Sequence, residues 1–195
     1  AQATGAAKNY SLSNGVSYSN AVTPGQVQSG FDLYEDRDTV QVDFLIAPGM
    51  DSVDDQATIA NDLVTTAYSL RKDCVAVTSP SEKSVIKGAK AASTITDLVV
   101  AEGKKYTSSS YLVADNNWIK VYDKYNDKYI HIPAASSTAG IMALSDKNTA
   151  PWYSPAGQRR GHLLGVTDLA WSPSKTQRDS LYKAYINPIA NIPGQ

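Results

Sequence analysis

The stretch VQVDFLIA, Val40–Ala47, decides the fold, because its apolar residues first alternate and then run together, as in a strand that enters a buried sheet. A Pro-Gly pair closes the stretch, and Ser52 then begins a segment with helical spacing of apolar residues as far as Leu70. The apolar run Cys74–Val77 predicts a central strand buried on both faces. Strand, helix and strand in this order predict a parallel pair joined by a right-handed crossover.

A second helix is predicted directly after this strand. Ser79 is placed at its N-cap and Pro80 at its first helical position. Glu82 lies three residues past the cap, and Gly103 is placed to end the helix. Tyr111–Ala114 predicts a third buried strand. The pattern predicts an α/β fold: a mainly parallel sheet with flanking helices on both faces.

The next segment predicts a hairpin and a further helix. Trp118–Tyr122 and Tyr129–Ile132 are two strands that flank a polar turn. His131 lies in the second strand, where we expect a partly buried structural side chain. Ala134–Leu144 then predicts a helix with a face of small residues.

The regular pattern ends after this helix. Gly165–Trp171 predicts one more strand, and Ser172 or Ser174 is placed to cap a last helix that runs to about Tyr185.

Three regions follow from these patterns. Residues 1–36 are rich in Ala, Ser, Asn, Gly and Gln and have no helical period, which predicts an extended or β arm, or a linker from an upstream domain. Residues 37–148 predict the α/β core domain. Residues 149–195 predict a loop, a strand and a helix that lead into a further C-terminal domain.

The composition narrows the range of functions. Of the residues, 42% are hydrophobic and 19% are charged, which suits a globular fold with a core. The formal net charge is −1, so no basic surface for nucleic acid or an anionic membrane is expected. The single cysteine, Cys74, excludes an internal disulfide framework.

No cofactor or metal site is predicted. Two histidines and one cysteine supply no zinc set with the usual spacing. The densest acidic group, Asp51, Asp54, Asp55 and Asp62, lacks the spacing of a calcium loop and suits a helix start instead. Neither of the glycine-rich phosphate-binding motifs occurs.

One enzymatic alternative is a degenerate α/β serine hydrolase built on Ser137 and His131. Ser136 and Ser137 stand at a predicted helix start, where a subtilisin-type nucleophile lies, but a cap is the simpler role there. The subtilisin order needs Asp, then His, then Ser, and no histidine precedes His131. A working triad is therefore not expected.

From Trp118 onward, the sequence resembles the tail sheath proteins of contractile phages of the T-even type. Four motifs carry the resemblance in order: the strand-turn-strand of residues 118–135, TAGIMALSD at 138–146, APWYSPAGQRRG at 150–161, and LAWSPSKTQRDSLY with INPI at 169–182 and 186–189. Ala134-Ala135 replaces the glycine-containing turn of the family. For residues 1–117 the resemblance rests on the α/β order alone.

The resemblance implies a subtilisin-like sheath core domain in a structural subunit without enzymatic activity. Copies of such a subunit polymerise helically around a tail tube protein and rearrange on contraction, which drives the tube through the host envelope. The implied location is the virion, after assembly in the host cytoplasm. Sheaths of type VI secretion systems and R-type pyocins remain open alternatives of the same class. Because the strand-exchanging arms of the family are not recognisable here, residues 1–195 alone are expected to be monomeric.

The loop Thr149–His162 holds the candidate subunit interface: Trp152, Arg159, Arg160 and His162. In one interpretation Trp152 plugs the bottom of the domain and the arginines are ordinary solvated charges. In the other, Trp152 anchors the loop while Arg159 and Arg160 face acidic groups of a neighbouring subunit or of the tube.

Overall fold

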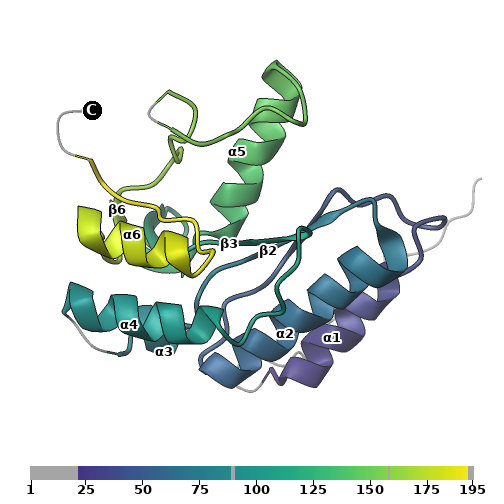
Figure 1. Cartoon of the computed structure of the whole chain (residues 1–195), viewed down its shortest axis with the longest axis horizontal. Coiled ribbons are helices and arrows are strands. Elements are labelled where there is room, and N and C mark those ends of the chain that lie inside the picture. The colour runs from purple at the N-terminus through teal and green to yellow at the C-terminus, as the bar shows by residue number, and fades with distance from the viewer. Residues whose placement is uncertain (1–21, 89–90, 158, 193–195) are drawn as a thin grey trace, which may run out of the picture.

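The computed structural model describes residues 22–88, 91–157 and 159–192. The elements in chain order are shown in Figure 1 and are α1 Pro24–Phe31, η1 Asp32–Tyr34 (a 3-10 turn), β1 Phe44–Ile46, α2 Val53–Thr65, η2 Thr66–Arg71 (a π-helix), β2 Val75–Thr78, α3 Glu82–Val85, α4 Ala92–Gly103, β3 Leu112–Ala114, β4 Trp118–Asp123, β5 Lys128–Pro133, α5 Ala135–Asn148, β6 Asp168–Leu169 and α6 Lys175–Lys183.

The central layer is a parallel sheet with the strand order β1-β2-β3. Leu45 lies opposite Ala76 in the first pair of strands, and Val77 lies opposite Val113 in the second. Helices provide both crossovers, as parallel neighbours require. Figure 1 shows α1 and α2 on one side of this sheet and α5 on the other. The prediction of a parallel sheet is confirmed.

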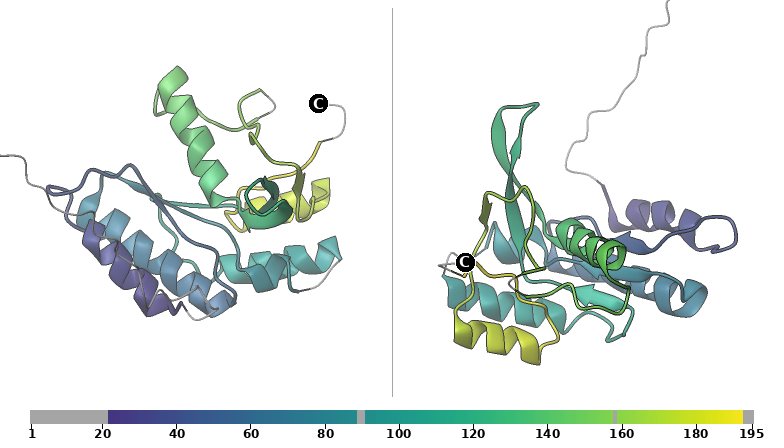
Figure 2. Two further views of the ribbon diagram at one scale, coloured as in Figure 1. Left: turned by 180° about the vertical axis from the view of Figure 1, so that it is seen from behind. Right: turned by 90° about the horizontal axis from the view of Figure 1, so that it is seen from above.

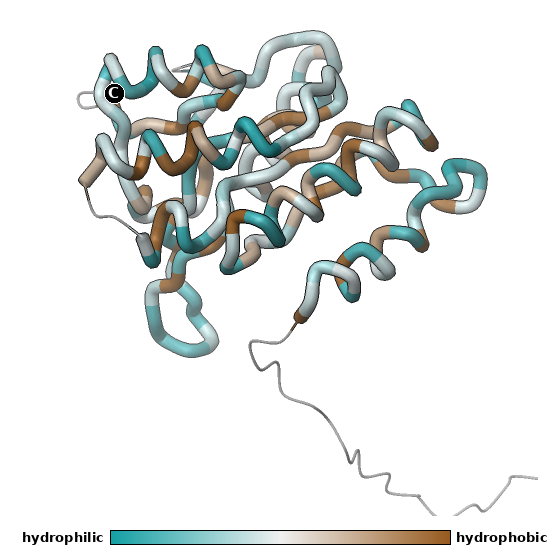
Figure 3. The backbone as a smooth tube through the Cα atoms, turned by 60° about the horizontal axis from the view of Figure 1, so that its bottom comes forward, coloured by the Kyte–Doolittle hydropathy of each residue, from teal (hydrophilic) through white to brown (hydrophobic). Residues whose placement is uncertain are grey.

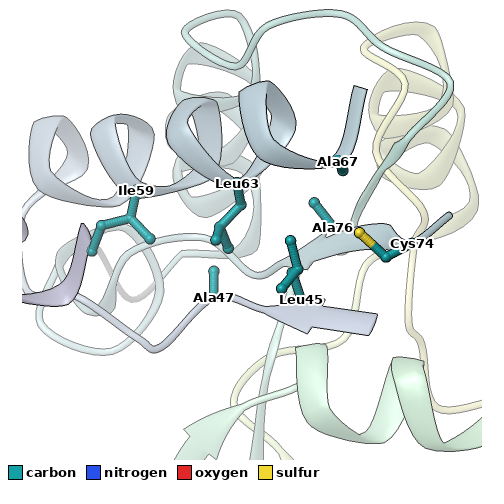
Figure 4. Close-up of a cluster of buried hydrophobic side chains, with 7 residues drawn as sticks. All are labelled: Leu45, Ala47, Ile59, Leu63, Ala67, Cys74 and Ala76. Carbon is teal, nitrogen blue, oxygen red and sulfur yellow. The ribbon is translucent and has the colours of Figure 1, made fainter. Parts of the chain in front are cut away.

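The hydrophobic core between α2 and the sheet holds the helix in place (Figure 4). Ile59 and Leu63 extend from α2 toward the sheet, where Leu45 lies, and none of the three is more than 3% exposed. Full burial of such a side chain contributes roughly 1.5–3 kcal/mol. The other members are small, which lets the helix approach the strands closely: Ala47, Ala67, Cys74 and Ala76.

The opposite face of the sheet is covered by the small-residue face of α5. Ala135 and Ala139 are buried against Val77, with Phe44 and Val113 packed around them.

A second sheet is antiparallel, with the order β5-β4-β6. β4 and β5 form the predicted hairpin, in which Ile119 pairs with Ile132 and Lys120 with His131. The hairpin extends away from the rest of the molecule (Figure 2). His131 is exposed on it, so the expectation of a partly buried side chain is wrong. The predicted strand at 165–171 is reduced to the two residues of β6.

A second core joins α4, α6 and the start of β4. Trp118 and Trp171 are 6% and 7% exposed, and Leu181 of α6 is fully buried among the same side chains. The indole Nε1 of Trp118 donates to the carbonyl of Pro80 at 2.7 Å, so its polar atom is satisfied inside the core. This packing places the last helix against α4.

The helix after β2 differs from the prediction. Ser79 is not an N-cap: α3 begins at Glu82 after Ser81, and it ends at Val85 instead of continuing to Gly103. The Oγ of Ser79 is used elsewhere, donating to Asp115 at 3.0 Å and accepting from the amide of Ala135 at 2.8 Å. A helix start at Ser79 would require that oxygen for capping, so tertiary contacts override the local signal.

The predicted extended arm differs as well. The part of that prediction on residues 1–21 lies outside the described residues. Residues 24–34 are helical instead of extended, because Thr23 caps α1 and Gln26 completes a capping box with Pro24 in the first turn. Val27 and Phe31 then pack against the core of α2 and the sheet.

Candidate interaction surface

The four residues proposed as an interface lie in the long connection between α5 and β6. Trp152, Arg159, Arg160 and His162 are all exposed. The described part of this connection contains no helix or strand before β6, so its shape depends on turns and side-chain contacts.

Trp152 does not plug the domain. It is 82% exposed, and its ring meets that of Tyr153 edge-on at a centroid distance of 5.8 Å. The two tryptophans that fill a core are Trp118 and Trp171 instead. The interpretation in which Trp152 plugs the domain is therefore wrong, and this indole is available on the surface.

Tyr153 anchors the loop. Its carbonyl accepts a hydrogen bond of 3.0 Å from Ser145 Oγ on α5, and its amide donates to the carbonyl of Ala150. The guanidinium of Arg160 stacks over its ring at 4.1 Å from the centroid. A cation–π contact at an exposed site contributes about 0.5–1 kcal/mol, which is enough to bias the arginine toward one orientation.

A tight turn presents the arginines. Gly157 has φ of +100°, a conformation that side chains other than glycine adopt with strain. Its carbonyl accepts from the amides of Arg160 and Gly161 at 3.3 and 2.8 Å. Among the described residues neither Arg159 nor Arg160 forms a salt bridge. The loop therefore offers two guanidinium groups to a partner.

His162 lies at a shallow hollow of about 260 Å³ between this loop and the C-terminal segment. Asp168 and Asn191 also line the hollow. His162 thus belongs to the same exposed edge as the arginines without contributing to a closed pocket.

The hydrolase alternative finds no support in the geometry. Ser137 lies half-buried in the first turn of α5, whereas His131 is exposed on β5. Both residues are described, and no hydrogen bond joins their side chains. A nucleophile and its base must lie within hydrogen-bonding distance, or close to it, for activation.

The described residues show neither a metal-binding cluster nor a membrane-spanning helix. Within residues 22–88, 91–157 and 159–192, no three His, Cys, Asp or Glu side chains are grouped to hold a metal ion. In the same ranges no helix has the length and apolar character that crossing a bilayer requires.

A buried polar cluster at the carboxyl ends of β2 and β3 was not anticipated. Asp115 is 2% exposed, and its Oδ2 accepts from Ser79 Oγ at 3.0 Å and from Thr138 Oγ1 at 3.2 Å. Burial raises the pKa of this carboxyl to about 7, although the bonds from Asn117, Ser79 and Thr138 oppose the shift. The feature of the sequence that could have indicated this cluster is the polar run Asp115–Asn117, which directly follows a buried strand.

The same run holds the C-terminal segment. Asn116 Oδ1 accepts from the amide of Ile189 at 2.7 Å, and Asn117 Nδ2 donates to the carbonyl of Trp171 at 2.7 Å. Asn187 also bonds to the carbonyl of Ala114. The cluster therefore connects β3, α5 and the end of the chain, and it serves packing, since its hydroxyl groups are already bonded and buried.

Comparison with known proteins gives one consistent result. A family model described as the phage tail sheath protein central domain matches residues 21–195. The chain is 34% identical over 194 residues to the tail sheath protein of Enterobacteria phage T4, covering 94% of this chain and 29% of that protein. It is 30% identical over 179 residues to the tail sheath protein of Vibrio phage KVP40, covering 85% and 27% respectively.

A solved structure shows the same fold. The helical sheath of the anti-feeding prophage in its contracted state matches with a TM-score of 0.59 at 16% identity, over 88% of this chain and 41% of that chain. The chain thus spans under a third of the length of the two phage relatives and less than half of the structural one.

Proposed function

The chain belongs to the phage tail sheath protein family, and we propose that it forms the central part of a structural subunit whose copies polymerise into the helical sheath of a contractile tail. The observation that carries this proposal is the family match over residues 21–195, with relatives of the same description in two phages. The shared fold with a contracted sheath supports it.

In the proposed assembly the sheath surrounds a tail tube protein, and its contraction drives the tube through the host envelope. Each domain stays rigid while the contacts between subunits change. The free energy then comes from interfaces that are better satisfied in the contracted arrangement, so the motion needs no chemical fuel. The proposed location is the tail of the virion, with assembly in the host cytoplasm.

This role is structural and does not involve catalysis. No observation favours the hydrolase alternative, since Ser137 and His131 are not brought together and Ser79 is 1% exposed with its oxygen bonded on both sides. We therefore assign no catalytic residue and no cofactor.

The exposed loop between α5 and β6 is the proposed subunit contact. Trp152 offers a large apolar surface, and Arg159 and Arg160 offer planar groups that pair with carboxylates through two bonds. Tryptophan, tyrosine and arginine are the residues most often found at the energetic centre of interfaces. His162 lies on the same edge and is included in the contact.

Two finer points are part of the proposal. The parallel sheet with helices on both faces is the counterpart of the subtilisin-like domain that the family resemblance implies. The division into an arm at 1–36, a core at 37–148 and a connection at 149–195 to a further domain also stays a prediction.

The experiment is electron microscopy of the full gene product, purified alone and together with the tail tube protein of the same phage. We expect hollow helical polymers that form around the tube and can be driven into a shorter, wider state. A gene product that stays monomeric under every condition in which the tube protein itself polymerises would contradict the proposal.

A further inference from the structure

An acidic surface lies in a part of the chain that is separate from the exposed loop between α5 and β6. Residues 32–38, the acidic segment, hold four carboxylates and one arginine, and all seven residues are exposed. The segment also carries an apolar centre, since Leu33 is 76% and Tyr34 is 42% exposed. It follows α1 and begins the loop that leads to β1, which Figure 3 shows as a hydrophilic projection.

A buried arginine holds this segment in one shape. Arg71 is fully buried at the end of η2, and its guanidinium donates to the carbonyls of Tyr34 at 2.6 Å, Asp36 at 3.4 Å and Val40 at 2.8 Å. Its remaining donors form two bonds of 3.0 and 3.1 Å to Asp73. All five N–H groups of the guanidinium are therefore used.

Asp36 also shapes the segment from within. Its carboxylate accepts from the amide of Asp38 at 3.0 Å and from Thr39 Oγ1 at 2.8 Å, and these bonds hold the pKa of Asp36 below its usual value. Among residues 22–88, 91–157 and 159–192, Asp32 and Glu35 form no such bonds through their carboxylates, which are exposed toward a partner. A surface that is ordered before binding loses less conformational entropy when it binds.

The loop between α5 and β6 has the complementary character. Residues 149–164, the basic loop, contain two arginines and no carboxylate. Its apolar groups are exposed as well: Trp152 is 82% and Leu164 is 81% exposed. Each surface thus combines apolar side chains with a net charge, and the two net charges are opposite in sign.

The two surfaces cannot meet within one molecule. Figures 1 and 2 show the loop that follows α1 at one end of the long axis, whereas the connection from α5 to β6 runs from the tip of α5, near the middle, toward the other end. A contact between two different surfaces of identical subunits is heterologous, and repetition of it generates an open helix or a closed ring.

We propose that the acidic segment of one subunit docks onto the basic loop of the next copy, with Asp32 and Glu35 facing Arg159 and Arg160. This inference rests on the proposed function, because it names the contact surface that the helical assembly uses. Leu33 and Tyr34 cover Trp152 and Leu164 in the same contact, so that the charge pairs surround an apolar centre. Arg71 acts as a positioning residue for the acidic side.

Charge exchange in the full gene product tests the contact. The variants are Arg159→Glu with Arg160→Glu, Asp32→Lys with Glu35→Lys, and all four substitutions in one chain. Each double variant places like charges at every contact, so we expect the critical concentration for assembly to rise at least about tenfold. The fourfold variant restores opposite charges, and we expect it to assemble within about threefold of the wild type.

The control is Lys124→Glu with Lys128→Glu, which changes the net charge by the same amount as the arginine double variant, but on the exposed β4–β5 turn. Circular dichroism confirms that each variant is folded. The proposed contact is overturned if both double variants assemble normally, or if the fourfold variant does not recover assembly. In either case, polymers of the wild type would still support the proposed function. A wild type that never polymerises would instead remove the proposed function itself.

Discussion

Ser79 Oγ and Asp115 Oδ2 lie 3.0 Å apart in the buried space where β2 and β3 end. The bond joins two neighbouring strands, and the same serine oxygen accepts from the amide of Ala135 at the start of α5. The Asp115 carboxyl therefore links the parallel sheet to α5. The protonation state of this carboxyl affects the stability of the domain.

The first prediction concerns pH. The pKa of Asp115 is about 7 in the folded protein, against 3.8 for an ordinary aspartate, which is the value that applies to the unfolded chain. At a pH between these two values, the carboxyl is protonated in the folded state and ionised in the unfolded state. The free energy of unfolding should therefore fall as pH rises from about 4 to about 7, by up to about 4 kcal/mol. Urea unfolding across this range measures the slope.

Asp115→Asn is the matched variant, since an amide keeps the shape of the group without a charge to bury. Its pH dependence between about 4 and 7 should be flatter than that of the wild type. The carboxylates whose pKa values are lowered, such as Asp54 and Asp73, remain in both proteins, so the difference isolates Asp115. Equal slopes in the two proteins would contradict the assignment.

The second prediction concerns Arg71. Replacing it by Met removes all its hydrogen bonds and leaves the carbonyls of Tyr34 and Val40 without their partner. Loss of one partner from a buried ionic network destabilises a protein by about 3–5 kcal/mol. Urea unfolding measures this. The control is Arg37→Met, since that side chain is 61% exposed and should matter by less than about 0.5 kcal/mol.

The third prediction contrasts two tryptophans. Trp152→Ala should change the free energy of unfolding by less than about 0.5 kcal/mol, because the side chain is 82% exposed. Trp118→Ala should lower it by about 3–5 kcal/mol, because it empties a core and leaves the carbonyl of Pro80 without its donor. Thermal or urea unfolding of the two variants side by side decides this. A large loss at Trp152 would mean that the loop packs differently.

The fourth prediction concerns catalysis. A fluorophosphonate probe should not label Ser136 or Ser137, because neither His131 nor His162 forms a hydrogen bond with either serine in the structure, and Ser136 Oγ donates to the carbonyl of Pro133 instead. Mass spectrometry of the treated protein is the measurement, with His131→Ala as the comparison. Labelling of one of these serines that disappears in His131→Ala would establish the hydrolase alternative.

The fifth prediction concerns residues 1–195 expressed alone. We expect a monomer at micromolar concentration, because a contact made of a few exposed ion pairs and a small apolar centre is weak by itself. Sedimentation velocity at several protein and salt concentrations measures this. Oligomers whose size does not depend on concentration would show that the chain holds a stronger interface than the acidic segment and the basic loop.

Several elements could be predicted from local patterns alone. The strand around Leu45, the run Cys74–Val77 and the hairpin from Trp118 all appear close to their expected positions. Ser52 caps α2 as expected, with its Oγ accepting from the amide of Asp55 at 3.1 Å. These signals are reliable because the residues that produce them are neighbours in the sequence and act on the same turn or strand.

Other signals failed because a distant residue competed for the same atoms. The helix predicted from Ser79 begins only at Glu82, since Asp115 and Ala135 use the Ser79 oxygen. The carboxylate of Glu102 on α4 fixes Ser81 through its amide and hydroxyl at 2.7 and 2.9 Å. The amides of Glu82 and Lys83 in the first turn of α3 donate to the carbonyls of Met50 and Asp51.

The sequence by itself determined the order of the strands, the parallel sheet and, through four linked motifs, the family. Only the tertiary structure decided that Trp152 is exposed while Trp118 is buried, and that Asp115 is a buried carboxyl. It also decided that the acidic segment and the basic loop lie apart from each other in the molecule. The physical reason is that periodicity and capping act between neighbours in the chain, whereas burial, pKa and the position of a surface depend on residues that only folding brings together.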